Sequence, residues 1–148
     1  MTLGVAESCT GGRVADLLTD VPGASRFFLG GVVSYTNDVK VNVLRVSREV
    51  LAREKAVSLA VVGQMAEGIR AVTRASIALA VVGYAGPDAD PSGHAPVGTV
   101  HVAVAGRVEA ARSAILSGTR RQVKTGAAAM ALRLVLDTLD DLPLEARG

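Results

Sequence analysis

The run "SIALAVVG" at residues 76–83 constrains the fold more than any other feature, because nearly every side chain in it is apolar. Such a run is typical of a central β-strand that is covered on both faces. Shorter apolar runs at residues 2–6 and 30–35 predict two further strands. Segments with helical spacing lie between these strands, so we expect an α/β fold.

Apolar side chains recur at helical spacing in five segments. We expect Ser47, Ser58 and either Asn37 or Asp38 to cap three of these helices, and the last helix to cover residues 120–139. The apolar stripes are Val14, Leu17, Leu18 and Val21; Val39, Val43 and Leu44; Val50 and Leu51; Val61, Val62, Met65, Ile69 and Val72; and Val123, Ala127, Met130, Leu134 and Val135.

Two apolar runs flank Gly106-Arg107, which predicts an antiparallel hairpin before the last helix. The expected architecture is therefore a three-layer α/β/α sandwich with a mixed, mostly parallel sheet and one C-terminal antiparallel hairpin. A length of 148 residues, 49% of them hydrophobic, fits a single domain over residues 1–148 with one aliphatic core. The Gly/Pro/Asp-rich segment 84–98 is a long loop, and such loops are usually functional or mobile.

Charge and cysteine content narrow the classes of function and location. The 16 basic and 14 acidic residues leave a net charge of only +2 without basic runs, so we expect no nucleic-acid partner. The single cysteine excludes an internal disulfide and favours a reducing cytoplasm. We expect neither a signal peptide nor a membrane partner, since the start has no basic and apolar leader and no apolar run is long enough to span a bilayer.

Polar segments follow three of the predicted strands: "ESCTGG" at 7–12, "YTNDVK" at 35–40 and "GYAGPD" at 83–88. Ligands in open α/β sheets bind beyond the carboxyl ends of the strands. If these strands are neighbours, the three segments form one pocket.

Ser8, Tyr35 and Lys40 provide the side chains that a serine nucleophile requires. A lysine can accept the serine proton if burial lowers its pKa, and a tyrosine can relay or orient that proton. The alternative is a solvated Lys40 and a Tyr35 that only packs. Free N–H groups at Gly11 and Gly12 suit a phosphate or an oxyanion, unless Ser8 or Thr10 simply caps the following helix.

Other side chains offer competing chemistry. Cys9 can act as a nucleophile with His94 or His101 as base, or remain a buried, inert thiol. Three carboxylates lie at the predicted strand ends: Glu7, Asp38 and Asp88. Each can orient Lys40, hold a ribose hydroxyl or simply face solvent. Arg120 and Arg121 either meet a phosphate or face solvent. No spacing typical of a zinc site is present in the sequence, so no metal is expected.

Taken together and in order, the motifs "AESCTGG", "YTNDVK", "AVS" at 56–58, "GYAGPD" and "PVGTV" at 96–100 resemble the CinA carboxy-terminal domain family, the competence-damage-inducible family. The resemblance extends from about residue 3 to the last helix. Active members of this family are nicotinamide-nucleotide amidases of the PncC type.

The resemblance implies an α/β/α domain that hydrolyses nicotinamide mononucleotide to nicotinate mononucleotide and ammonia, in pyridine-nucleotide salvage. It implies no metal or organic cofactor, a pyridine nucleotide as small-molecule partner, and a homodimer or higher homo-oligomer. The family's catalytic serine, tyrosine and lysine match Ser8, Tyr35 and Lys40. The residues implied to bind the substrate are Thr10, Gly11, Gly12, Asn37, Gly83, Ala85, Gly86, Pro87 and Arg120.

Three departures from the family pattern bear on activity and substrate preference. Tyr84 stands where a smaller aliphatic residue is usual, Thr119 replaces an aspartate, and the family's helix before the first strand is missing. These departures leave a second hypothesis open: a catalytically weak or inactive nucleotide-binding or assembly module of the same fold.

Overall fold

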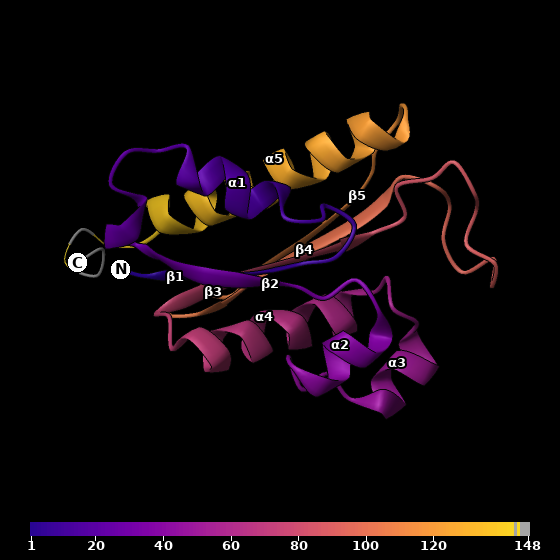
Figure 1. Ribbon diagram of the computed structural model, residues 1–148, viewed down its shortest axis with the longest axis horizontal. Coiled ribbons are helices and arrows are strands. Elements are labelled where there is room, and N and C mark those ends of the chain that lie inside the picture. The colour runs from indigo at the N-terminus through magenta and orange to yellow at the C-terminus, as the bar shows by residue number, and fades with distance from the viewer. Residues whose placement is uncertain (144, 146–148) are drawn as a thin grey trace.

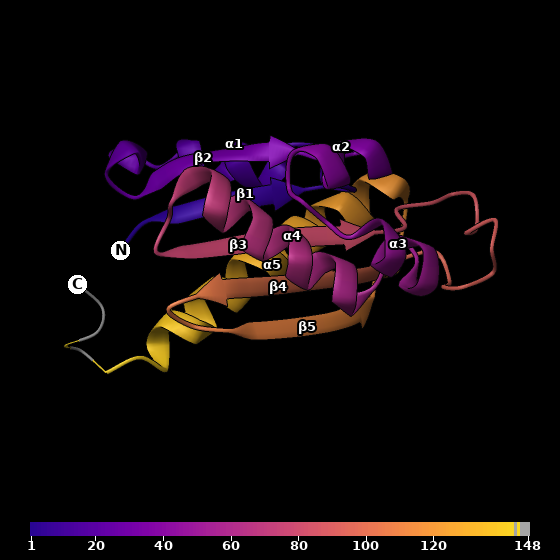
Figure 2. The same ribbon diagram turned by 90° about the horizontal axis from the view of Figure 1, so that it is seen from below.

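A five-stranded mixed sheet forms the centre of the computed structural model, which describes residues 1–143 and 145. Its strand order is β2-β1-β3-β4-β5, visible from one face in Figure 2. The parallel strands are β1 (Leu3–Glu7), β2 (Phe28–Val33) and β3 (Ile77–Gly83). β4 (Thr99–Gly106) runs antiparallel to β3, and β5 (Ala110–Ile115) antiparallel to β4. The predicted mixed sheet and C-terminal hairpin are confirmed.

Helices cover both faces of this sheet (Figure 1). α1 (Arg13–Thr19) and α5 (Arg120–Asp140) pack on one face; α2 (Asn37–Asn42), α3 (Arg48–Glu54) and α4 (Leu59–Thr73) lie on the other. A short 3₁₀ helix at Ala24–Arg26 precedes β2.

Alternate strand side chains supply the two apolar cores. In β3, Leu79 and Val81 face the core beneath α1 and α5, whereas Ala80 and Val82 face the core beneath α4. All four are fully buried, as the apolar run of the central strand predicted. The three-layer sandwich is therefore confirmed.

Some predicted element details are wrong. Val21 lies beyond the end of α1, and the stripe of α4 ends at Ile69, because Val72 is exposed. β2 begins at Phe28 and ends at Val33, two residues earlier than predicted at each end. A glycine is required at position 31 of this strand, because any Cβ there would lie 2.7 Å from the Val5 carbonyl oxygen. The cap of α2 is Thr36, whose hydroxyl accepts from the Val39 N–H, rather than Asn37 or Asp38.

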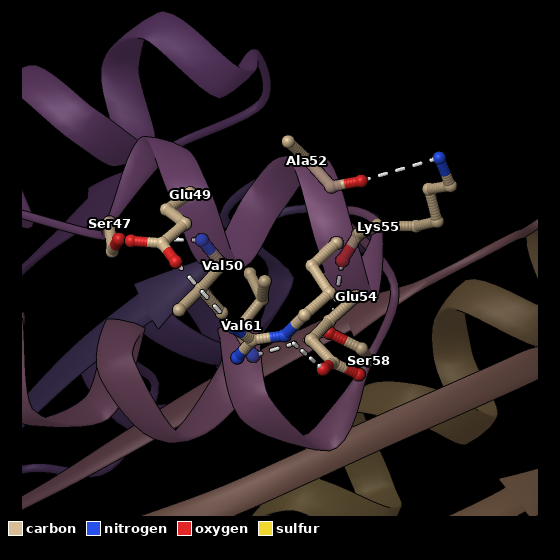
Figure 3. A network of polar contacts seen from close by, with 9 residues as sticks. Ser47, Glu49, Val50, Ala52, Glu54, Lys55, Ser58 and Val61 are labelled. Atoms are coloured by element: carbon tan, nitrogen blue, oxygen red, sulfur yellow. Dashed lines mark hydrogen bonds and ion pairs between the residues drawn. The ribbon is translucent and has the colours of Figure 1, made fainter.

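Serine caps begin both α3 and α4 (Figure 3). The hydroxyls of Ser47 and Ser58 accept from the N–H groups of Val50 and Val61, which confirms both predicted caps. Ser58 also donates to the carbonyl of Lys55, at the end of α3. Ser58 therefore ties the end of α3 to the start of α4.

A capping box begins α5. The Thr119 hydroxyl accepts from the Gln122 N–H, and the Gln122 side chain accepts from the Thr119 N–H. This cap places Arg120 beside the carboxyl ends of the parallel strands. Although α5 has 21 residues, none of the helices in the described part of the chain is long and apolar enough to cross a membrane.

Candidate active site

A cavity of about 250 Å³ lies at the carboxyl ends of β1, β2 and β3, at the end of the sheet where the 84–98 loop projects in Figure 1. Its wall includes most of the residues that the sequence and the family resemblance predicted for a site, namely Ser8, Tyr35, Asn37, Lys40, Gly83, Ala85, Gly86 and Arg120. The predicted residues Thr10, Gly11, Gly12 and Pro87 lie outside this wall.

Lys40 lies in the last turn of α2 and is buried, with only 2% of its surface exposed. Its Nζ lies 2.7 Å from the carbonyl oxygen of Ser34, 3.3 Å from that of Tyr35 and 3.2 Å from Ser8 Oγ. The two carbonyl oxygens only accept hydrogen bonds, so two N–H groups of the amine point toward them. In the neutral amine the lone pair is then left for the Ser8 hydroxyl.

The protonation of Lys40 follows from this burial. Removal from water lowers the pKa of its ammonium from 10.5 to about 8, opposed only by the nearby Cys9 sulfur. About one molecule in ten then carries a neutral Lys40 at pH 7, against about one in three thousand for a solvated lysine. The alternative of a solvated helix lysine is wrong, and Lys40 is placed to accept a proton from Ser8.

Ser8 lies immediately beyond β1. Its N–H donates to the carbonyl of Val81 at 3.1 Å, which continues the pairing of β1 with β3, and its own carbonyl accepts from the Gly11 N–H. The backbone is thus held on both sides of the residue whose hydroxyl faces Lys40.

The side chain of Glu7, at the end of β1, caps the N-terminus of α1 beside the N-cap residue Gly12, a role that the sequence left unassigned. Its buried carboxylate accepts from the Thr10 hydroxyl at 2.5 Å and from the N–H groups of Gly12, Val14 and Ala15 at 2.9–3.1 Å. A carboxylate at a helix N-terminus satisfies unpaired donors and interacts favourably with the helix dipole.

This cap corrects two expectations for the "AESCTGG" turn. The Gly12 N–H donates to Glu7 and the Gly11 N–H donates to the Ser8 carbonyl, so neither is a free donor for an anion. The Thr10 hydroxyl is also taken, by Glu7. The alternative that Ser8 or Thr10 caps the helix is wrong too, since a carboxylate does so.

The Tyr35 phenol is bonded to Arg120 and not to Lys40. Its hydroxyl accepts from Arg120 at 2.9 Å, and a second N–H of the same guanidinium donates to the Gly86 carbonyl at 2.6 Å. Tyr35 is 59% exposed, so this bridge lies at the mouth of the cavity. The contact of Tyr35 with Lys40 is made by its backbone carbonyl instead. Arg120 thereby joins the walls formed by α5, the β2–α2 turn and the loop after β3.

The competing cysteine–histidine arrangement is not assembled. Burial raises the pKa of the Cys9 thiol to about 11, which keeps it protonated near neutral pH. His94 and His101 line a different cavity, where His101 Nδ1 lies 2.6 Å from the Ser113 Oγ. In the described part of the chain, no group of three or more His, Cys, Asp or Glu side chains is arranged so that it could hold a metal ion.

The sequence interpretation missed a buried carboxylate in the loop beside the cavity. The carboxylate of Asp90 accepts hydrogen bonds from the N–H and the hydroxyl of Ser92 and from the N–H of His94. These hydrogen bonds, the one from the Ser92 hydroxyl most of all, lower the pKa of Asp90 to about 2. It also interacts with the hydroxyl of Tyr84, a residue of the cavity wall. An aspartate between proline and small polar residues looks like a solvated loop charge, so sequence alone had no signal for this anchor.

Fold and site together define a class: a three-layer α/β domain with a serine and a buried lysine in contact at the carboxyl ends of its parallel strands. The family model "CinA C-terminal domain" matches residues 1–139, and the chain belongs to that family. The predicted resemblance is thus confirmed.

Named relatives agree with this assignment. A putative competence-damage inducible protein of Desulforudis audaxviator is 47% identical over 95% of this chain, and a CinA-like protein of Frankia casuarinae is 47% identical over 96%. The chain spans about a third of the length of these relatives (34% and 33%). Among solved structures, the competence damage-inducible protein A of Klebsiella pneumoniae superposes with a TM-score of 0.92 at 38% identity, covering 96% of this chain and 88% of that one.

Proposed function

We propose that this domain hydrolyses the carboxamide of nicotinamide mononucleotide by acyl transfer to Ser8. The observation that carries the proposal is the buried Lys40 amine 3.2 Å from Ser8 Oγ, inside a cavity at the strand ends. The CinA family includes amidases, and the residues of this cavity match the motifs on which the resemblance to its nicotinamide-nucleotide amidases rests.

The chemistry begins with proton transfer. Neutral Lys40 takes the hydroxyl proton of Ser8, and Ser8 Oγ forms a bond to the carboxamide carbon. The resulting ammonium of Lys40 gives that proton to the departing nitrogen, and the C–N bond breaks to release ammonia. Water then attacks the ester, Lys40 accepts its proton, and Ser8 leaves with a proton restored as nicotinate mononucleotide is formed.

The negative charge that develops on the carbonyl oxygen needs N–H donors. Gly11 and Gly12 are excluded because their N–H groups are already bonded. Within the described chain, the N–H groups of Ala85 and Gly86 donate to no acceptor, and both residues line the cavity. We assign the oxyanion donors to this turn.

Ammonia release from nicotinamide mononucleotide tests the proposal, with Ser8→Ala compared against Ser113→Ala. Ser113 is a matched control because its hydroxyl also meets a basic side chain, His101, but in a separate cavity. We expect Ser8→Ala to reduce turnover by a factor of about 1,000 or more and Ser113→Ala to retain it. Unchanged turnover in Ser8→Ala contradicts the assignment. Binding of the nucleotide by the unaltered chain without any turnover supports instead the non-catalytic module.

A further inference from the structure

Besides Lys40, two side chains of opposite charge line the cavity and form no ion pair with each other. Asp88, in the loop after β3, and Arg120, at the start of α5, both belong to its wall. In the part of the chain that the structure describes, neither forms an ion pair, since Arg120 donates only to neutral oxygens. A cavity with an unpaired anion and an unpaired cation fits a ligand that itself carries both charges.

Aromatic side chains are concentrated at the same place. The chain has only two tyrosines, and both Tyr35 and Tyr84 line this cavity. Their hydroxyls are engaged by Arg120 and Asp90, respectively. Each ring is therefore tethered at its polar end, and tethered aromatic rings bind flat, positively charged groups favourably.

These observations locate the two ends of the ligand. Arg120 is at the exposed mouth beside Tyr35, where an anionic group remains partly in water. A carboxamide must reach Ser8 and Lys40 on the inner side, so the ring lies between the carboxamide and the phosphate, in the cavity that Tyr84 and the exposed Asp88 also line.

We propose that Asp88 determines specificity by recognising the positive charge of an oxidised pyridinium ring, while Arg120 binds the phosphate of the same nucleotide. This inference rests on the proposed function, because it takes the pyridine nucleotide as ligand. Asp88 thereby selects the oxidised nucleotide over its dihydro form, whose ring is neutral but whose carboxamide and phosphate are the same.

The test measures dissociation constants of oxidised and reduced nicotinamide mononucleotide by calorimetry, in the Ser8→Ala background that prevents turnover. Adding Asp88→Asn is expected to weaken binding of the oxidised form about threefold to fivefold and to leave the reduced form unchanged. Adding Arg120→Gln is expected to weaken both forms equally, because both carry the phosphate. Asp38→Asn is the matched control, since Asp38 is an exposed aspartate paired with Arg48 outside the cavity.

Equal weakening of both forms by Asp88→Asn, no effect on either, or no binding of either form overturns the inference. Failure of the proposed function is a separate result: it is the absence of ammonia release by the unaltered chain. Ring-charge selection by Asp88 then remains measurable as a difference in binding, so the two failures are distinguishable.

Discussion

Replacing Lys40 with methionine tests whether burial holds this amine close to neutrality. At pH 7 a lysine whose pKa falls from 10.5 to about 8 makes folding less favourable by about 3 kcal/mol, because the unfolded chain keeps the proton at no cost. Methionine removes that penalty but also the hydrogen bonds of the amine to the Ser34 and Tyr35 carbonyls and to Ser8, together worth about 1–2 kcal/mol. We expect Lys40→Met to raise the free energy of unfolding by about 1–2 kcal/mol at pH 7.

The effect of Lys40→Met on the free energy of unfolding depends on pH. Between pH 8 and 10.5 the unfolded chain binds more protons at Lys40 than the folded chain, so stability of the unaltered protein rises across this window. By pH 10 the penalty falls to about 1 kcal/mol, and the advantage of Lys40→Met disappears. Urea unfolding of both proteins at pH 7 and pH 10 measures this change of about 2 kcal/mol.

The control is Lys55→Met, because Lys55 is exposed and its replacement removes no buried amine. A Lys40→Met difference that is independent of pH refutes the reasoning, since it shows that the Lys40 ammonium is solvated in the folded chain.

Three further changes give separate readouts. Glu7→Gln removes the charged cap of α1 and should lower the free energy of unfolding by about 1–3 kcal/mol in urea titrations; an unchanged midpoint contradicts the capping role. Cys9→Ala should keep ammonia release within about threefold, because its thiol stays protonated; loss as complete as in Ser8→Ala makes Cys9 the nucleophile. Asp90→Asn should speed proteolysis within residues 84–98, since it weakens hydrogen bonds from Ser92 and His94. The carboxylate of Asp90 supports the loop above pH 3.8 and loses this effect as pH falls through about 2. Cleavage of the unaltered chain at acid pH should therefore approach that of Asp90→Asn. Identical cleavage of both proteins at neutral pH argues against the anchor.

Features that depend on repeating apolar patterns were predictable. The central strand around Leu79, the buried stripe from Val61 to Ile69 and the serine caps all appear in the structure close to where the sequence placed them. Such patterns repeat over several residues, so one exception such as Val72 does not obscure them.

Features that depend on the direction of one side chain were not predictable. Glu7 looked like any carboxylate after a strand, although its contacts turn it into a helix cap. Tyr35 was expected to assist Lys40 with its phenol, yet the phenol meets Arg120, which is 85 residues away in sequence. Lys40 stands in a polar motif that gives no sign of burial, yet only 2% of its surface is exposed and its amine is bonded to the Ser34 carbonyl.

The most direct test of the central claim is to trap the acyl-enzyme. Acid quenching during turnover of nicotinamide mononucleotide, followed by tandem mass spectrometry, locates any covalent adduct within the peptide that contains both Ser8 and Cys9. We predict the nicotinate mononucleotide acyl group as an ester on Ser8, retained in Cys9→Ala and absent in Ser8→Ala. An adduct on Cys9, or turnover of Ser8→Ala at the normal rate, contradicts the account.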